Sequence, residues 1–195
     1  MAKRVLLCGV GGQGTILAAH VLAEVAMANG FDVKVSEIHG MAQRGGSVTT
    51  VVTFGEDVHS MVSGIGESDY LISFDKLEAL RNIADLKKGS PLIVNDLTIK
   101  PQSVLTGSKE IPANIDDLLD EHSAILVPAE SIAKEAGNAK AANMVMLGAL
   151  SYMLEFSDQS WQDCIREHVP PKTIEINIEA YKGGRAFAQE HASDL

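Results

Sequence analysis

Cysteine is scarce in this chain of 195 residues, and its scarcity limits the metal chemistry that the chain can support. Only Cys8 and Cys164 are present, and they lie far apart in the sequence. An iron-sulfur cluster needs four thiolates as a rule, so the chain cannot hold a cluster by itself. No Cys/His pair stands at zinc-finger spacing either. We therefore expect no metal site and interpret both cysteines as reduced core residues.

Positive charge and long hydrophobic runs are also in short supply. The formal net charge is -10, which argues against a nucleic-acid partner because nothing resembles a basic stripe that could neutralise phosphates. After the basic start, the apolar run extends only from Val5 to Cys8, too short for a signal-peptide core or a membrane span. The sequence therefore predicts a cytoplasmic protein that has no membrane partner.

The motifs of self-sufficient enzymes are missing. There is no serine-containing nucleophile elbow and no H-E-x-x-H pattern, and the glycine-rich turn continues as Gly14-Thr15 instead of Gly-Lys-Thr. The catalytic residues are thus unknown, and the chain looks like an incomplete catalyst. No linker rich in proline or serine divides the sequence, so we expect residues 1–195 to form a single domain.

The strongest positive signal is an apolar run that leads directly into the glycine pattern Gly9-x-Gly11-x-x-Gly14. A helical pattern through Ala28 and an alternating strand ending at Glu37 follow, as in a βαβ unit. Glycines at this spacing let a strand turn into a helix whose free N–H groups face an anion. The anion-facing turn would consist of Gly9, Gly11, Gly12, Gln13 and Gly14.

Several interpretations of this turn remain open. Glu37 stands 23 residues after Gly14, where a dinucleotide enzyme grips the ribose, so a freestanding NAD-dependent oxidoreductase is one alternative. Gln13 counts against NAD because its amide would project near the phosphates. A non-enzymatic nucleotide-binding module is another alternative, and a tight turn without any ligand is the simplest.

A second loop, residues 39–46, leads directly into a β-rich run from Ser47 to Phe54 instead of a second helix. Arg44 could offer its planar fork to a phosphate or carboxylate, and neighbouring glycines would let the backbone approach closely. The alternative is a solvent-exposed arginine beside a turn. The residues assigned to this active-site or interface loop, besides Arg44, are His39, Gln43, Gly45 and Gly46.

The rest of the chain predicts an α/β fold of three layers with a mostly parallel sheet, a Rossmann-like variant with an added β-hairpin. Asn143 is expected to cap, or hydrogen-bond at, the start of a buried helix. The expected elements are a hairpin strand at 58–62, strands at 70–74, 91–94 and 124–127, helices at 76–84, 143–153 and 158–168, an irregular segment at 97–121 with a short helix near 116–119, and a final helix at 173–190 interrupted by Gly183-Gly184.

Segments 9–14 and 37–48 together resemble the gamma-type subunit of 2-oxoacid:ferredoxin oxidoreductases. The stretch from Asn143 to Leu150 is similar to a late helix of that family, so the resemblance runs over almost the whole chain. The motif His-Gly-Met-Ala-Gln-Arg-Gly-Gly is most similar to the small beta subunit of indolepyruvate ferredoxin oxidoreductase. Subunits for 2-oxoglutarate or pyruvate tend to carry Tyr-Gly-x-Glu-x-Arg-Gly-Gly instead.

This resemblance implies an enzyme that oxidatively decarboxylates a 2-oxoacid, joins the acyl group to coenzyme A and passes electrons to ferredoxin. The chain has no Gly-Asp-Gly motif of the kind that anchors thiamine diphosphate through magnesium. The resemblance therefore implies a larger partner subunit that holds thiamine diphosphate, Mg and the iron-sulfur clusters. The role left for this chain is to close the active site and to guide coenzyme A, whose phosphates would meet the glycine turn or Arg44.

Overall fold

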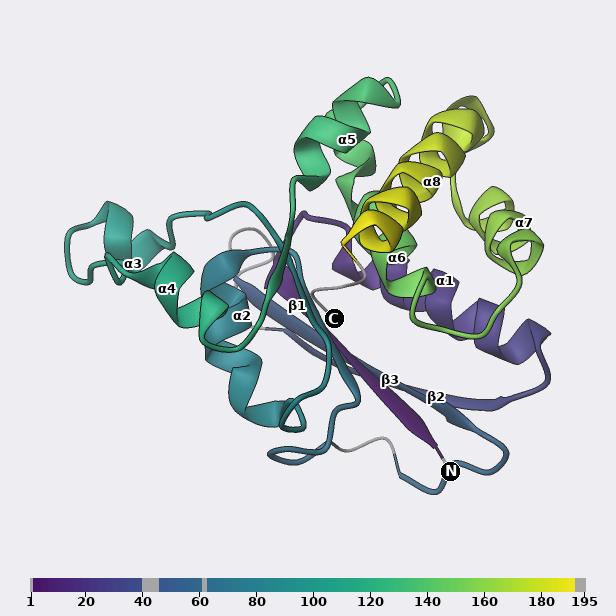
Figure 1. Ribbon diagram of the computed structural model, residues 1–195, viewed down its shortest axis with the longest axis horizontal. Coiled ribbons are helices and arrows are strands. Elements are labelled where there is room, and N and C mark those ends of the chain that lie inside the picture. Colours follow the sequence, from purple (N-terminus) through teal and green to yellow (C-terminus); the bar gives the residue numbers. More distant parts are fainter. Residues whose placement is uncertain (1, 40–45, 61–62, 192–195) are drawn as a thin grey trace.

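A six-stranded sheet lies at the centre of the computed structural model, which describes residues 2–39, 46–60 and 63–191 (Figure 1). Its strands lie in the order β2-β3-β1-β4-β5-β6. Only β3 runs against the others among the described strands, because it is antiparallel to β1 and β2 while the remaining pairs are parallel. The strands are β1 (Lys3–Val10), β2 (Asp32–His39), β3 (Ser47–Gly55), β4 (Tyr70–Ser73), β5 (Leu92–Asn95) and β6 (Ile125–Val127).

Helices cover both faces of the sheet and make the predicted three layers (Figure 1). The larger hydrophobic cluster packs one face against α1 (Thr15–Ala28), α5 (Ala129–Glu135), α6 (Ala142–Ser151), α7 (Asp158–His168) and α8 (Ile174–Glu190), with the short turns η2 (Ala139–Ala141) and η3 (Pro171–Thr173) between them. The smaller cluster packs the other face against α2 (Lys76–Asn82), η1 (Ile83–Asp85) and α4 (Ile115–Asp120), and α3 (Gln102–Leu105) precedes α4 in the chain.

The central strand β1 shows why the core has two halves. Val5 and Leu7 belong to the larger cluster, whereas Leu6 and Cys8 belong to the smaller one. Successive side chains of a strand point to opposite faces of the sheet, and all four of these residues are almost fully buried. A continuous apolar run is therefore what this central position requires.

The added β-hairpin consists of β2 and β3, and β3 lies between β2 and β1. The sequence prediction of a hairpin strand at 58–62 is wrong for residues 58–60, which form no strand, and residues 61–62 lie outside the described part of the chain. The physical reason is that β1 and β2 already occupy both edges of β3. No edge of β3 is left for another strand.

The predicted helix at 158–168 is confirmed as α7, and the Ser157 Oγ accepts a hydrogen bond from the Ser160 amide at its start. The short helix expected near residues 116–119 is α4, whereas α3 was not predicted. None of the described helices is both long enough and apolar enough to cross a membrane.

The predicted interruption of the last helix at Gly183-Gly184 is wrong, because α8 is continuous through both residues. Gly184 instead faces α6, where a Cβ would lie 1.9 Å from the Val145 carbonyl oxygen. In return, a Cβ on Gly148 of α6 would lie 2.0 Å from the Tyr181 carbonyl oxygen. The glycines therefore serve the close approach of two helix backbones and not a break in α8.

This close approach predicts that Gly184→Ala will lower the free energy of unfolding by about 3 kcal/mol or more, since the added methyl group meets backbone that can move only by separating the helices. Urea denaturation followed by circular dichroism measures the loss. Gly183→Ala is the comparison variant because its Cβ would lie 2.5 Å from a side-chain atom, Ile132 Cγ2, and not from backbone, so we expect a smaller loss. Alanine also favours the helix over glycine by about 1 kcal/mol at that position. Equal losses in the two variants would contradict this account of the helix contact.

Candidate functional site

The glycine turn lies between the end of β1 at Val10 and the start of α1 at Thr15. The Gln13 amide donates to the Val10 carbonyl over 3.1 Å, which closes the turn. Gly12 and Gly14 have φ values of +104° and +79°, a region that residues with a Cβ rarely adopt. The predicted strand-to-helix turn is therefore present, and its exposed residue Gly12 has open space beside its Cα.

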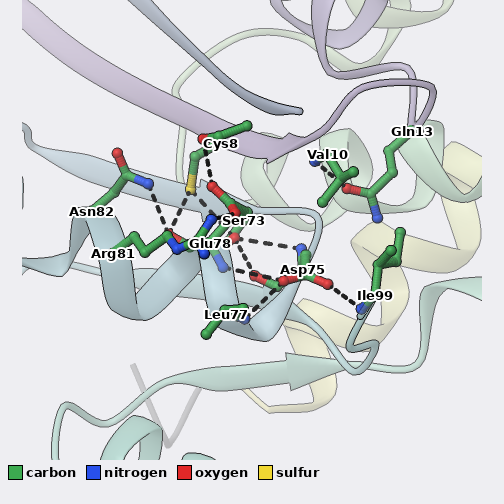
Figure 2. A network of polar contacts seen from close by, with 11 residues as sticks. Cys8, Val10, Gln13, Ser73, Asp75, Leu77, Glu78, Arg81, Asn82 and Ile99 are labelled. Carbon is green, nitrogen blue, oxygen red and sulfur yellow. Dashed lines mark hydrogen bonds and ion pairs between the residues drawn. The ribbon is translucent and has the colours of Figure 1, made fainter. Parts of the chain in front are cut away.

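The Gln13 side chain turns into the protein and does not project toward a phosphate as expected (Figure 2). Its Oε1 accepts from the Val10 amide and its Nε2 donates to the Phe74 carbonyl, each over 2.7 Å. A Cβ on Gly9 would lie 2.8 Å from the Gln13 Oε1 atom. Gly9 thus makes room for an amide that joins the ends of β1 and β4.

Asn143 brings the start of α6 to the glycine turn. Its Nδ2 donates to the Gly14 carbonyl over 3.3 Å, and its Oδ1 accepts from the Met144 amide over 3.0 Å. Asn143 is 5% exposed, and a Cβ on Gly14 would lie only 2.6 Å from its Nδ2 atom. Two segments separated by 129 residues in sequence therefore meet in one contact.

The second loop meets the glycine turn at its last residue. The Gly11 amide donates to the Gly46 carbonyl over 2.8 Å. The backbone of His39 ends β2, whereas Gln43, Arg44 and Gly45 lie outside the described residues. The structure therefore joins the two predicted site segments through Gly11 and Gly46.

Glu37 does not occupy the position that the NAD alternative requires. In the dinucleotide-binding fold the second strand lies next to the first, but here β3 separates β2 from β1. Glu37 pairs in register with Thr50, which pairs with Leu7, so about 10 Å of sheet separates its backbone from β1. This strand order does not support a ribose grip by Glu37.

A cavity of about 400 Å³ adjoins the glycine turn past the carboxyl ends of β1, β4, β5 and β6. Ligands of α/β proteins bind at this edge of the sheet, where the strand order reverses. The polar and aromatic residues that line the cavity are Gln13, Phe74, Asn95, Glu130 and Lys140, beside the backbone of Gly12.

Sequence analysis missed Asn95, Glu130 and Lys140. Asn95 directly follows a predicted buried strand, and Glu130 comes three residues after another, at Val127. A polar residue at the carboxyl end of a parallel strand was the signal that could have found the first two. Lys140 comes from η2, and no local pattern points from there to the cavity.

The Phe74 carbonyl connects the cavity wall to the glycine turn. It accepts from Gln13 Nε2 and also from Asn95 Nδ2, the latter over 3.2 Å. Asn95 Nδ2 also donates to the Glu130 Oε1 over 3.0 Å, and Asn95 Oδ1 accepts from the Ala129 amide over 3.3 Å. One hydrogen-bonded chain therefore runs from the turn to the start of α5.

A buried carboxylate orders the other side of the wall (Figure 2). Asp75 is 1% exposed, and its Oδ1 accepts from the amides of Leu77 and Glu78 at the start of α2. Its Oδ2 accepts from the Ile99 amide over 2.5 Å, and Ile99 lines the cavity. Asp75 therefore caps α2 and holds the chain that follows β5 in place.

Glu78 is the second buried carboxylate, and it reaches the base of the second loop. Its Oε2 accepts from the Ser47 hydroxyl over 2.6 Å, while Arg81 pairs with its Oε1 over 2.5 Å. Glu78 is 2% exposed, so the ion pair and the hydroxyl offset the cost of burying its charge. Ser47 follows Gly46, and thus two bonds fix the return of the loop beside the glycine turn.

Lys76 holds the segment after β5 against α2. Its Nζ atom lies 2.5 Å from the Asp96 Oδ1 and 2.7 Å from the Asp116 Oδ1. Burial lowers the pKa of Lys76, but the hydrogen bonds with Asp116 and Asp96 outweigh burial and raise that pKa above its usual value. The ammonium therefore stays charged between α2, α4 and the end of β5.

The cysteines do not form a metal site. Cys8 is fully buried beside the Ser73 hydroxyl, and desolvation raises the pKa of its thiol to about 12 (Figure 2). Cys164 lies in the larger cluster on the opposite face of the sheet, and burial raises its pKa as well. Within the described ranges, no group of three or more His, Cys, Asp or Glu side chains is arranged to hold a metal. These two thiols therefore do not fit an iron-sulfur cluster.

Comparison with known proteins identifies the family of the chain. A family model described as pyruvate ferredoxin/flavodoxin oxidoreductase matches residues 4–187. The indolepyruvate oxidoreductase subunit IorB of Thermococcus kodakarensis is 40% identical, with 95% of this chain and 96% of the relative covered. The 2-oxoglutarate synthase subunit KorC of Methanothermobacter marburgensis is 31% identical, with 97% of this chain and 98% of the relative covered.

A solved structure shares the fold over nearly its whole length. The gamma subunit of the keto/oxoacid ferredoxin oxidoreductase from Geobacter sulfurreducens superposes with a TM-score of 0.72 at 26% sequence identity. The match covers 96% of this chain and 99% of that subunit. The overall fold of this chain is therefore one that a solved gamma subunit shares.

The inward position of Gln13 predicts that Gln13→Ala will lower the free energy of unfolding by about 1–3 kcal/mol, because the Val10 amide and the Phe74 carbonyl each lose a partner. Gln159→Ala, on the exposed side of α7, is the control and should change stability by about 0.5 kcal/mol or less. Chemical denaturation of both variants measures the difference. A Gln13 variant as stable as the control would rule out a structural role for this amide.

Proposed function

Because the chain belongs to the pyruvate ferredoxin/flavodoxin oxidoreductase family, we propose that it is the small subunit of a 2-oxoacid:ferredoxin oxidoreductase and that its 2-oxoacid is indolepyruvate. The observation that carries the proposal is the 40% identity, over 95% of the chain, to an indolepyruvate oxidoreductase subunit. The His39–Gly46 motif supports the same substrate. The protein is then a cytoplasmic single domain that is inactive alone.

The reaction assigned to the complex balances with coenzyme A and ferredoxin. The 2-oxoacid loses its carboxylate as carbon dioxide, and the remaining acyl carbon forms a thioester with the sulfur of coenzyme A. Two electrons leave that carbon for two oxidised ferredoxins, and the thiol proton is released. Thiamine diphosphate, when bound, stabilises the carbanion that decarboxylation leaves.

We assign thiamine diphosphate, Mg and the iron-sulfur clusters to a larger partner subunit. The cysteines of this chain support placing the iron-sulfur clusters on the partner. Cys8 and Cys164 are buried on opposite faces of the sheet and cannot bind one cluster together. The chain contacts ferredoxin only through the complex in this proposal. Neither nucleic acid nor a membrane is a partner, in keeping with the charge of -10.

This chain would cover the active site with the edge of the sheet that carries the glycine turn. Gly12 is exposed at the start of α1, where backbone N–H groups favour an anion such as a phosphate of coenzyme A. The Gly11–Gly46 hydrogen bond places the end of the second loop beside the same turn. Arg44, two residues before Gly46, would supply the cation.

Reconstitution tests the assignment. The chain should copurify under anaerobic conditions with a larger thiamine-containing subunit as a yellow-brown complex that reduces ferredoxin only when indolepyruvate and coenzyme A are both present. The isolated chain should not bind NADH, since β3 separates Glu37 from the glycine turn. A stable monomer that is active alone, or micromolar NADH binding measured by cofactor fluorescence, would contradict the subunit assignment. Binding of a nucleotide without any partner-dependent activity would favour the non-enzymatic module.

Arg44→Ala should raise the KM for coenzyme A in the complex by about tenfold or more, since a guanidinium-phosphate pair is a charge-assisted bond. Steady-state kinetics with varied coenzyme A measures this change. Arg166→Ala, on the exposed side of α7, is the control and should leave the KM unchanged. Unchanged kinetics together with normal copurification of the Arg44 variant would remove Arg44 from the site.

A further inference from the structure

The charge of the cavity beside the glycine turn suggests which part of a ligand can enter it. The charged side chains in its wall are one half-buried carboxylate, Glu130, and one exposed ammonium, Lys140. A phosphate placed against Glu130 would meet a like charge in a partly desolvated site. Gly12 also lines the cavity, and it is an exposed residue of the turn at the start of α1.

The hydrogen-bonding groups of the wall show what the cavity has left to offer. Both protons of the Asn95 amide are used, by the Phe74 carbonyl and by Glu130 Oε1, and its oxygen accepts from Ala129. Both ends of the Gln13 amide bond to backbone. The hydrogen bond between Asn95 and Glu130 falls on the Oε1 atom, so it leaves Oε2 available to accept. Apart from the Lys140 ammonium, the charged group left in the described wall is therefore an acceptor, which calls for a ligand that donates.

We propose that this cavity holds an uncharged, hydroxyl- or amide-bearing group of the ligand, with Glu130 Oε2 accepting its hydrogen bond, while the phosphates of that ligand remain at Gly12 and Lys140. The volume of about 400 Å³ lies within the usual range of ligand pockets, roughly 300–1,000 Å³. The inference rests on the proposed function for coenzyme A as the ligand. Its ribose and its pantetheine arm share the required chemistry.

The hydrogen bond from Asn95 orients the Glu130 carboxylate in the cavity wall, unlike a side chain that moves freely in solvent. The Asn95 side chain is 2% exposed and is held at three points by residues 74, 129 and 130. One oxygen of Glu130 is therefore occupied by a rigid donor. The second oxygen is positioned without a large loss of side-chain entropy when the ligand binds.

Binding of separate probes to the purified complex tests this division of the site. Isothermal titration with pantetheine, adenosine and inorganic pyrophosphate reports on the two uncharged groups and on the anion. Glu130→Gln keeps the shape and should weaken the uncharged probe that binds by about tenfold, while pyrophosphate binding stays equal or tightens. Lys140→Gln should weaken the binding of pyrophosphate and leave the binding of the uncharged probe unchanged. Glu135→Gln, on the exposed end of α5, is the control and should change neither.

The kinetics of the complex distinguish ligand binding by Glu130 from a purely structural role of this residue. Glu130→Gln should raise the KM for coenzyme A by about tenfold with kcat and the melting temperature unchanged. Whichever of adenosine and pantetheine responds to the variant identifies the part of the ligand in the cavity.

Three results would overturn the inference: no uncharged probe binds the wild-type complex, Glu130→Gln affects pyrophosphate and the uncharged probe equally, or it affects neither. If that happens in a complex that still consumes indolepyruvate and coenzyme A, the subunit assignment stands and only the inference fails. Failure of the proposed function is recognised separately, since the chain would then capture no larger subunit and support no turnover.

Discussion

The Gln13 side chain holds together the part of the molecule on which the site depends. It bonds to the amide of Val10 at the end of β1 and to the carbonyl of Phe74 after β4. These two strands are neighbours, but the chain leaves them toward opposite sides of the sheet, because α1 leads from β1 to β2 and α2 leads from β4 to β5. This link joins the glycine turn to the cavity wall at the point where the strand order reverses.

Two buried carboxylates hold further segments in place around the glycine turn and the cavity. Asp75 caps α2 and holds Ile99 at the cavity, while Glu78 holds Ser47 at the return of the second loop. Each is nearly inaccessible to water and each is fully bonded, which is the condition under which a buried polar network makes a structure more specific. The glycine turn is therefore surrounded by fixed neighbours on the side of α2 as well as on the side of α6.

The insertion of β3 changes the chemical meaning of the glycine pattern. In the dinucleotide-binding fold, a pattern such as Gly9-x-Gly11-x-x-Gly14 works with an acidic residue on the adjacent strand. Here the adjacent strand is antiparallel and brings Gly46, from a loop with an arginine, to the turn instead. The same glycines thus belong to a surface that completes a site shared with another subunit in the proposed function.

Local patterns predicted much of this fold because their causes are local. The apolar run before Gly9 indicated a strand, the glycines indicated the turn, and the pattern over 158–168 indicated α7. The contacts that Gly46 and Asn143 make with this turn were not predicted, because they join segments far apart in the chain.

The sequence by itself determined the succession of elements and the chemical nature of the turn, since both follow from residues close together in the chain. Only the tertiary structure decided the strand order, the continuity of α8 through Gly184, and the meeting of Asn95, Glu130 and Lys140 at one cavity. The reason is that strand pairing and helix contact join segments far apart in sequence. The energy of those contacts depends on which surfaces meet, and no local pattern records that choice.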